Sequence, residues 1–386
     1  MIDVGAMSGD RAKVRPVESA RDFDRFFRLP WTIYRGDPLW VPPIKASARA
    51  ELRPESNPFL RHCDYRLFIL ERGGSVVGRI AAMVDRLAVE AWGEKIGMFA
   101  YFECLEPKRP GAGSDAALLL GAARDWLRAQ GMKTMRGPWS FLSQEWGVVI
   151  EGFSPEAVIM APYNPPEYAA LLELFGLRKA KDLLAWELSV PDGYRIPDRI
   201  LKLTDAVAQR FKLRMRTIDF ADYEREVDFF ARLSLETLDG NWGISPITDE
   251  EIAALARDLR PVLRKECVIF ATNEKGEDVG FALSIPDVNV ILKKTRGRML
   301  PFGWARLLLG IPRLRRYRMF ALGVAAAYQG KGVDALLYRE MWERMAGPDV
   351  TMEVNYVLED NAPMVNAINK LGARPSRRYR VYEMGV

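Results

Sequence analysis

The sequence predicts an α+β protein with a mixed sheet, folded as two domains that repeat one order of elements. Its 386 residues are enough for two domains of ordinary size. Strand-like and helix-like stretches alternate in both halves of the chain. A short spacing also repeats, since Gly176 and Gly372 each end a helical stretch and each precede a glutamate, Glu187 or Glu383, by eleven residues. We interpret this repeat as the duplication of one domain.

The expected domain boundaries follow from composition and from turn residues. Residues 1–12 are small and polar, and we expect them to be disordered. Residues 13–190 are expected to form the first domain and residues 213–386 the second. Between them, residues 191–212 include a turn-like segment flanked by prolines, which we expect to be a linker.

In the first domain, apolar residues at strand or helix spacing are bounded by Gly, Pro and Ser. The expected strands are 66–71, 75–84, 96–104, 134–140 and 182–188, and the expected helices are 115–130 and 167–175.

The second domain repeats this alternation of strands and helices. The expected strands are 213–218, 267–272, 279–285, 319–326, 351–357 and 379–383, and the expected helices are 222–238, 249–259, 332–345 and 361–371.

Composition excludes several classes of chemistry. His62 is the only histidine, and the three cysteines, Cys63, Cys104 and Cys267, form no CxxC pair. This set cannot build a usual zinc site, so we expect no metal. No nucleophile signature accompanies His62, which we expect to be hydrogen-bonded or exposed beside Cys63. The scattered cysteines are typical of reduced thiols in a cytosolic protein.

The chain begins without the basic and apolar regions of a secretory signal. Its apolar runs are about ten residues long, shorter than the roughly 20 residues that a helix needs to span a bilayer. We therefore expect a cytoplasmic protein that at most lies on a membrane surface.

The most specific motif is a glycine-rich turn between a strand and a helix. Strand 319–326 leads into Gln329-Gly330-Lys331-Gly332-Val333-Asp334, where the helix begins. Such a turn aims backbone N–H groups and the positive end of the helix dipole at a phosphate, and glycine allows close approach. The spacing is neither that of a P-loop nor that of a Rossmann fold.

With the residues that follow it, this motif resembles the Gcn5-related N-acetyltransferase (GNAT) superfamily. Gln329 and Gly332 match the pyrophosphate loop of that superfamily, Gln/Arg-x-x-Gly-x-Gly/Ala. A later element of the superfamily resembles the stretch from Glu359-Asp360-Asn361 to Leu371-Gly372-Ala373. The first domain looks like a degenerate copy, because its glycine-rich loop at 110–114 lacks the Gln/Arg-x-x-Gly register.

The resemblance implies acyl transfer from acyl-CoA to an amine. It implies that strand 319–326, including Leu322 and Val324, binds the pantetheine arm. Loop 329–334 would hold the pyrophosphate, and Asn361 would border the same site. Strand 351–357 would diverge from its neighbour and leave a slot for the thioester.

Two departures from the family pattern matter. Asp334 stands where the family prefers Gly or Ala, and a carboxylate there disfavours a pyrophosphate unless it points away or pairs with Lys331. Ile368 stands where the family often has the Tyr that protonates the leaving thiolate. Tyr356, Tyr379 and Tyr382 are the candidates to replace it.

The best candidate for a general base is Glu353. Glu353 and Asn355 lie two residues apart on one strand and hence on one face. A buried glutamate beside the slot would have a raised pKa and could take a proton from an ammonium group. The alternative is that Glu353 forms a structural ion pair with an arginine. Glu103, Glu145 and Glu151 are further candidates, if the first domain faces the site.

An insertion separates strands 279–285 and 319–326, which are close neighbours in this fold. Residues 293–318 hold nine Lys or Arg and no acid, around the apolar centre 299–311. Removing these nine from the net charge of +5 leaves −4 for the rest of the chain. This composition suits a membrane interface or a lid over an acyl chain.

Two other interpretations of the insertion remain. It could be a helix packed on the core, with its arginines paired to surface acids. Nucleic-acid binding fits less well, because the aliphatic run is long.

The tandem copy, the insertion and the ending also resemble a group of bacterial proteins that includes the bacterial ceramide synthases. Those enzymes attach a fatty acyl group from acyl-CoA to the amine of a sphingoid base. The resemblance thus implies a lipidic amine acceptor and contact with a membrane through 293–318. The alternatives are a short-chain acetyltransferase acting on a soluble amine and a non-catalytic regulator that binds acyl-CoA.

Overall fold

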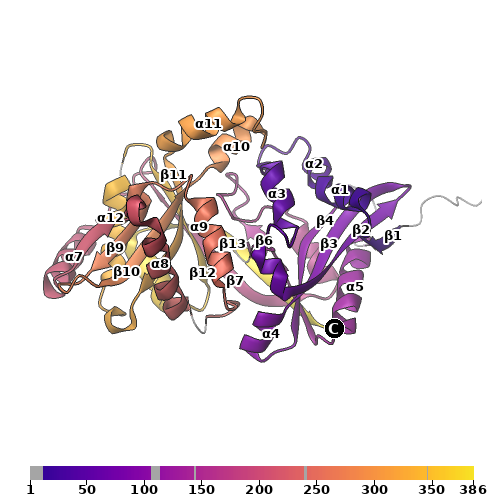
Figure 1. Cartoon of the computed structure of the whole chain (residues 1–386), viewed down its shortest axis with the longest axis horizontal. Coiled ribbons are helices and arrows are strands. Elements are labelled where there is room, and N and C mark those ends of the chain that lie inside the picture. The colour runs from indigo at the N-terminus through magenta and orange to yellow at the C-terminus, as the bar shows by residue number, and fades with distance from the viewer. Residues whose placement is uncertain (1–11, 106–113, 143–144, 239–240, 346) are drawn as a thin grey trace, which may run out of the picture.

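The computed structural model describes residues 12–105, 114–142, 145–238, 241–345 and 347–386. The chain forms two halves that stand on either side of a central gap and share one mixed sheet of 13 strands (Figure 1). The α+β class and the mixed sheet are therefore confirmed. The expected disorder at residues 1–11 and the first-domain loop at 110–113 lie outside the described residues.

The elements alternate as the sequence predicts, with several additional helices. The strands are β1 (Lys13–Pro16), β2 (Cys63–Arg72), β3 (Ser75–Asp85), β4 (Ile96–Cys104), β5 (Thr134–Trp139), β6 (Val148–Glu151), β7 (Arg178–Ser189), β8 (Arg214–Thr217), β9 (Val268–Thr272), β10 (Asp278–Pro286), β11 (Arg316–Val324), β12 (Thr351–Leu358) and β13 (Arg374–Gly385). The helices are α1 (Ala20–Arg28), α2 (Pro30–Ile33), α3 (Lys45–Glu51), α4 (Arg86–Trp92), α5 (Ser114–Ala129), α6 (Tyr168–Leu174), α7 (Asp198–Arg210), α8 (Tyr223–Leu238), α9 (Asp249–Leu259), α10 (Asn289–Thr295), α11 (Gly303–Gly310), α12 (Val333–Met345) and α13 (Ala362–Leu371).

The sheet repeats one strand order in its two halves. One side runs β1-β2-β3-β4-β5 and is antiparallel except for the parallel pair β4–β5. The other side runs β8-β9-β10-β11-β12 and is antiparallel except for the parallel pair β11–β12. The duplication expected from the sequence is thus visible as matching strand order.

The last strand of each half lies beside the other half. β7, which ends the first half, pairs with β12 of the second half. β13, which ends the chain, pairs with β5 and β6 of the first half. β7 and β13 also pair with each other, in the middle of the sheet. The two halves are therefore joined by an exchange of strands and not by a linker alone.

Helices cover the sheet and bury separate cores in the two halves. α5 packs on β2, β3 and β4, and α12 packs on β9, β10 and β11. Residues 191–212, expected to be a linker, contain α7, which packs against α12. Ile200 and Val207 of α7 are buried in the core of the second half. Its apolar positions recur at helical spacing, and the prolines that suggested a turn precede the helix.

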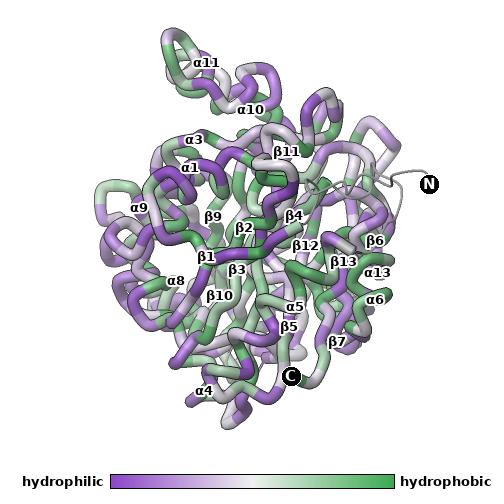
Figure 2. Tube along the Cα trace, turned by 90° about the vertical axis from the view of Figure 1, so that its right-hand side faces the viewer, coloured by the Kyte–Doolittle hydropathy of each residue, from purple (hydrophilic) through white to green (hydrophobic). Residues whose placement is uncertain are grey.

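The insertion between β10 and β11 forms α10 and α11. In Figure 2 these two helices project from the body of the molecule. Their buried side rests on Val41, Ile44 and Ile159 of the first half. Within the described residues, no helix is both long enough and apolar enough to cross a bilayer.

Candidate active site

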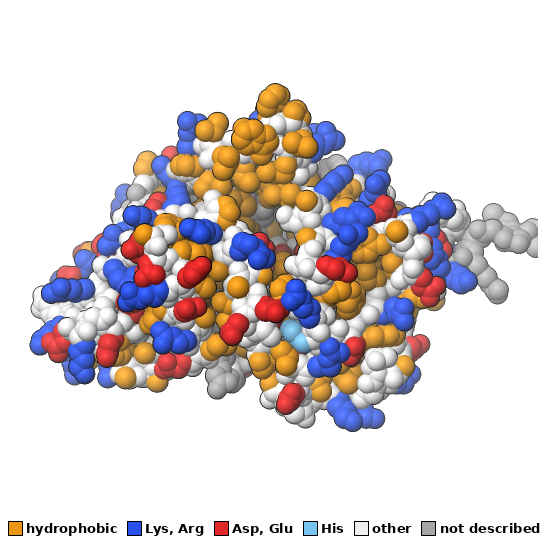
Figure 3. Space-filling model, in the orientation of Figure 1, with side chains coloured by type: hydrophobic (Ala, Val, Ile, Leu, Met, Phe, Trp, Pro, Cys, Tyr) orange, Lys and Arg blue, Asp and Glu red, His pale blue; other side chains and the backbone are white. Residues whose placement is uncertain are grey.

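A cleft of about 2960 Å³ lies between the two halves, and residues of both halves line it. Figure 3 shows its opening as a hollow in the middle of the face, below a group of apolar side chains at the top. The first half contributes α3, β4 and β5 to its walls, and the second half contributes α8, α9, β11 and β12.

β11 and β12 diverge beside this cleft. Their last parallel pair is Met319 with Val354, although the strands continue to Val324 and Leu358. From Phe320 onward, β11 lines the cleft, and its edge toward β12 is paired with no strand. Backbone groups on this edge are open to a ligand, and the divergence of the two strands expected from the resemblance is confirmed.

A β-bulge marks the point where the strands diverge. The register of β10 and β11 shifts between Leu283 and Ser284, which leaves Phe320 without a partner on β10. A bulge increases local twist and so turns the rest of β11 away from β12. Arg318 is only 2% exposed, and its Nη1 donates to the carbonyl of Ile159 at 2.9 Å. This bond ties the start of the divergence to the first half.

The glycine-rich turn has the geometry of an anion-binding loop. Gly330 has φ +68° and Gly332 has φ +82°, values that side chains larger than glycine rarely adopt. Gln329 donates from Nε2 to the carbonyl of Val324 at 3.0 Å, which fixes the loop against the end of β11. α12 starts directly afterwards, and its first N–H groups lack partners within the helix. The loop therefore presents donors at the mouth of the slot.

Lys331 and Asp334 point to different sides of this loop. Lys331 donates from Nζ to the carbonyl of Ala327 at 2.6 Å and lies over the rings of Phe211 and Tyr328. Asp334 lines the cleft in the first turn of α12, where the helix dipole favours a carboxylate. In the described part of the chain, no ion pair joins the two side chains.

The other residues expected to bind the donor divide into two groups. Leu322 and Asn361 line the cleft, and Asn361 also caps α13 by accepting a hydrogen bond from Met364 N at 3.2 Å. Val333 is fully buried in the core. Ile368 is likewise fully buried, so its position offers no proton donor to the cleft.

The comparisons with known proteins agree with this geometry. The chain is 30% identical over 378 residues to protein YghO of Escherichia coli, covering 96% of this chain and 94% of the relative. It is 30% identical over 387 residues to the bacterial ceramide synthase of Caulobacter vibrioides, covering 96% of each chain. A tandem GNAT protein from the clavulanic acid biosynthesis pathway is similar in structure, with a TM-score of 0.55 at 15% identity over 97% of this chain and 98% of that one.

The chain belongs to the family of these two bacterial relatives, and its fold is that of a tandem GNAT protein. No family model matches the sequence. The slot of β11 and the loop of Gln329 are suited to a CoA thioester, because they offer open backbone groups and helix N–H donors.

Near the divergence of the strands, Glu353 lies outside the cleft lining. It is 5% exposed, and its Oε2 lies 3.3 Å from Nε of Arg377, which is equally buried. Its Oε1 accepts hydrogen bonds from Asn355 Nδ2 at 2.6 Å and from Tyr379 Oη at 3.4 Å. This geometry favours the ion-pair interpretation of Glu353 over its role as a general base.

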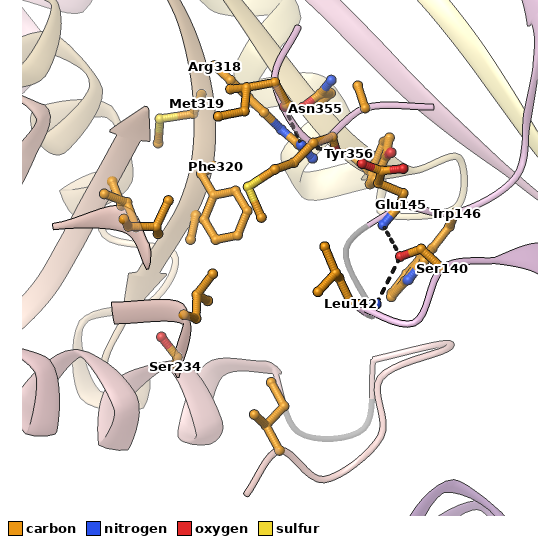
Figure 4. Close-up of a pocket in the computed structure, with 18 of the residues that line it drawn as sticks. Ser140, Leu142, Glu145, Trp146, Ser234, Arg318, Met319, Phe320, Asn355 and Tyr356 are labelled. Atoms are coloured by element: carbon orange, nitrogen blue, oxygen red, sulfur yellow. Dashed lines mark hydrogen bonds between the residues drawn. The ribbon is translucent and has the colours of Figure 1, made fainter. Parts of the chain in front are cut away.

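Asn355 and Tyr356 do line the cleft, next to the divergence of the strands (Figure 4). Asn355 Oδ1 is buried and makes no hydrogen bond among the described residues. Tyr356 stacks on Trp146 with ring centroids 6.4 Å apart, and the guanidinium of Arg318 lies 5.1 Å from its ring. Burial raises the pKa of Tyr356, so its hydroxyl stays protonated at neutral pH.

Glu145 is the acid of the first half that lies nearest to this place. Figure 4 shows it on the cleft wall with Tyr356 and Trp146. Ser140 Oγ accepts hydrogen bonds from the backbone N–H groups of Leu142 and Glu145, both at 3.3 Å, and so shapes the loop that carries Glu145. Burial raises the pKa of Glu145, against the opposing charge of Arg318.

A second carboxyl group, not predicted from the sequence, also lines the cleft: Glu51, at the end of α3. The hydroxyl of Tyr101 donates to Glu51 Oε1 and accepts from the N–H of Phe141 at 3.3 Å. Asn57 donates from Nδ2 to the carbonyls of Glu51 and Phe141, both at 2.8 Å. Burial and the charge of Glu145 raise the pKa of Glu51 to about 7, despite the hydrogen bond from Tyr101.

The two remaining candidate acids are already paired. Glu103 lines the cleft, but its Oε2 accepts from Arg79 Nε at 2.7 Å. Glu151 is exposed on β6, and its Oε2 lies 3.4 Å from Nε of Arg378. Neither carboxylate is as open to a ligand as Glu145.

His62, Cys63 and Asp85 are the one group of possible metal ligands found in the described residues. The imidazole of His62 already lies between two carboxylates, with Nδ1 2.9 Å from Asp85 and Nε2 3.4 Å from Glu251. The contact with Glu251 joins the first half to α9.

The insertion above the cleft combines an exposed apolar face with exposed cations. We call its apolar side chains the α11 face: Leu300 (81% exposed), Phe302 (71%), Trp304 (51%), Leu308 (59%) and Leu309 (70%). Six of the nine cations are exposed: Lys294, Arg296, Arg298, Arg306, Arg313 and Arg315.

The other three cations point inward. Lys293 and Arg316 pair with Glu156, at 2.9 Å and 3.5 Å, and Arg318 is buried in the cleft wall. The insertion therefore exposes six positive charges and not nine. Lys293 is paired with Glu156, and Arg316 and Arg318 belong to β11.

Proposed function

We propose that this GNAT protein transfers a long-chain acyl group from acyl-CoA to the primary amine of a lipid, with a sphingoid base as the acceptor and a ceramide as the product. The observation that carries this proposal is the cleft of about 2960 Å³. Pockets for drug-sized ligands measure about 300–1,000 Å³, so this space suits two long chains and exceeds what acetyl transfer to a small amine needs. The name of the relative from Caulobacter vibrioides supports the same choice.

In this proposal the donor lies along β11. Backbone groups from Phe320 to Val324 bind the pantetheine arm, and loop 329–334 receives the pyrophosphate through N–H groups and the helix dipole. Such contacts hold the thioester carbon in the slot beside Asn355 and position it for attack.

The chemistry is attack of a neutral amine on the thioester carbon. A carbon–nitrogen bond forms, the carbon–sulfur bond breaks, and CoA leaves as a thiol. We assign the protonation of the leaving sulfur to Tyr356, because its hydroxyl is protonated, buried and at the slot. Asn355 completes the slot, with an unpaired Oδ1 that can accept an amine N–H.

The α11 face is the proposed contact with a membrane. Sphingoid bases and ceramides reside in bilayers, so an enzyme that uses them must meet the lipid surface. Exposed aromatic and aliphatic side chains ringed by cations are the composition that binds an anionic bilayer interface. This face lies above the mouth of the cleft (Figure 3), so a lipid leaving the bilayer would enter it directly.

The test is turnover of the purified protein with palmitoyl-CoA or acetyl-CoA and sphinganine. Thiol release reports the reaction, and mass spectrometry identifies the product. We expect N-palmitoylsphinganine, with a lower kcat/KM for acetyl-CoA. Preference for acetyl-CoA and a soluble amine would replace this proposal by a short-chain acetyltransferase. Absence of thiol release with every amine tried would leave only a non-catalytic acyl-CoA-binding role.

A further inference from the structure

The first half contains its own divergence of strands, and its contents differ from those in the second half. β4 and β5 are parallel only as far as the pair Ala100 with Trp139. Tyr101, the next residue of β4, has φ +51°, an unusual value for a tyrosine in a strand. This conformation places its hydroxyl between Phe141 N–H and the carboxyl of Glu51. The place that receives the thioester in the second half is thus occupied by a polar cluster in the first.

Two carboxyl groups of this cluster face the cleft, and the surrounding residues hold them there. Asn57 connects the backbone of Glu51 to that of Phe141, next to the loop that bears Glu145. Ser140 shapes that loop through its bonds to backbone N–H groups. In the described residues, the carboxylate of Glu145 makes no hydrogen bond and no ion pair. A carboxylate that is oriented but unpaired, in an apolar cleft, is suited to receive a cation from a ligand.

We infer that the pair Glu51–Glu145 is the acceptor site, which binds the ammonium group of the amine and removes its proton before attack. This inference rests on the proposed function and assigns its acceptor side to the degenerate copy. Glu145 lies beside Tyr356 and Arg318 at the thioester slot, so Glu145 touches the amine. Glu51 is a positioning residue, which shares the proton and the charge of the pair.

The ammonium nitrogen gives one proton to the carboxylate of Glu145 and becomes a nucleophile. It attacks the thioester carbon, and the second proton lost by nitrogen goes to the leaving sulfur, through Tyr356. The proton on Glu145 passes to solvent when the products leave.

The pH dependence of this site is set by the groups that face the pair. They are Arg318 and Tyr356 from the second half, and Arg79 and Tyr101 from the first. Glu51 has a pKa of about 7. Since the pair must be deprotonated to bind and deprotonate the amine, kcat/KM for the amine falls as the pH drops through about 7.

The experiment compares Glu145→Gln, Glu51→Gln and the control Glu90→Gln, exposed on α4 outside the cleft, with palmitoyl-CoA and sphinganine over a range of pH. Loss of a general base lowers rates by about 10²–10⁴-fold, so Glu145→Gln is expected to lower kcat/KM for the amine at least about 100-fold. The KM for palmitoyl-CoA and the melting temperature are expected to stay unchanged. Glu51→Gln is expected to move the acid limb away from pH 7, and Glu90→Gln to behave as the unchanged protein.

A binding measurement keeps the test independent of turnover. N,N-dimethylsphinganine carries the ammonium charge but cannot form the amide, so it is expected to compete with sphinganine, and to compete more weakly in both variants. Unchanged kcat/KM in Glu145→Gln, or an unchanged acid limb in Glu51→Gln, would overturn the pair. If the unmodified protein acylates no amine, the proposed function itself fails, which is a different outcome.

Discussion

At the scale of single residues, Tyr356 is the group whose chemistry is most sharply defined. Its hydroxyl is buried at the slot, and burial raises its pKa, so it remains a proton donor at neutral pH. We expect Tyr356→Phe to lower kcat about 100-fold with little change in the KM for acyl-CoA, because the leaving thiolate loses its donor. Steady-state thiol release measures both constants.

Tyr382→Phe is the matched control for that variant. Tyr382 is fully buried, and its hydroxyl donates to Glu173 at 2.8 Å, away from the slot. It is expected to keep the full rate of thiol release. Equal rates in Tyr356→Phe and Tyr382→Phe would show that another group protonates the sulfur.

Glu353 provides the second prediction at this scale, one of stability. Its partner Arg377 is buried with it, so Glu353→Gln leaves a buried guanidinium without a counter-charge. Breaking such a pair costs about 3–5 kcal/mol, and we expect urea unfolding to show a loss of about that size. In Glu353→Gln, kcat/KM for the amine is still expected to fall as the pH drops through about 7. Lost turnover with unchanged stability would instead make Glu353 the base.

The residues of the site were only partly predictable from the sequence. The loop that begins at Gln329 was predictable from local residue spacing, and most of the predicted site residues line the cleft. Glu145 was a candidate only if the first half faced the site. Glu51 carries no local signal at all, because its place in the cleft depends on a hydrogen bond from Tyr101, which is distant in sequence.

At the scale of elements, strands and helices with a clear apolar period were predicted nearly to their ends. β4 and α9 have the bounds that the sequence indicates. The partners of β7 and β13 were not predictable. Each is a 12-residue strand, and its local sequence does not specify which half of the sheet it joins. Which half it joins is decided by packing over the whole sheet and not by local pattern.

The α11 face supplies the prediction at this scale. Burying two leucines in a bilayer interface is worth roughly 3 kcal/mol, about 100-fold in partitioning. We therefore expect the double variant Leu308→Asp, Leu309→Asp to bind vesicles that contain phosphatidylglycerol at least about 100-fold more weakly in a sedimentation assay.

Leu174→Asp is the matched control, because Leu174 on α6 is exposed by 70%, as is Leu309. It is expected to bind the same vesicles as the unchanged protein does. Equal binding by the double variant and the control would remove the membrane role of α11 and leave it as a cover of the cleft.

At the scale of the whole molecule, the cleft is bounded by contacts that join the two halves. The insertion reaches the first half through Lys293 and Glu156, and Asn289 Nδ2 donates to the carbonyl of Ala157 at 3.0 Å. On α9, Glu251 lies 3.4 Å from His62 of the first half. The shared sheet and these two bridges together set the width of the cleft.

The bridge at His62 depends on charge, and this gives a prediction of pH-dependent stability. Burial alone lowers the pKa of His62, but its hydrogen bonds to Asp85, Cys63 and Glu251 outweigh burial and raise it to about 11. An unfolded histidine has a pKa of about 6.5. Because the folded pKa is the higher one, the stability that His62 contributes is fully present below about pH 6.5 and is lost as the pH rises through 11.

We expect His62→Gln to lower the free energy of unfolding by about 1.5–3 kcal/mol at pH 6, the range for hydrogen bonds to charged groups. The difference in the free energy of unfolding between the two proteins should become smaller at pH 8 and smaller again at pH 10. The unfolded histidine is neutral at these pH values, so folding requires the uptake of a proton, which becomes less favourable as the pH rises. Urea unfolding at the three pH values measures it. A difference that does not change with pH would mean that His62 acts through neutral packing, and that the bridge to α9 carries no charge.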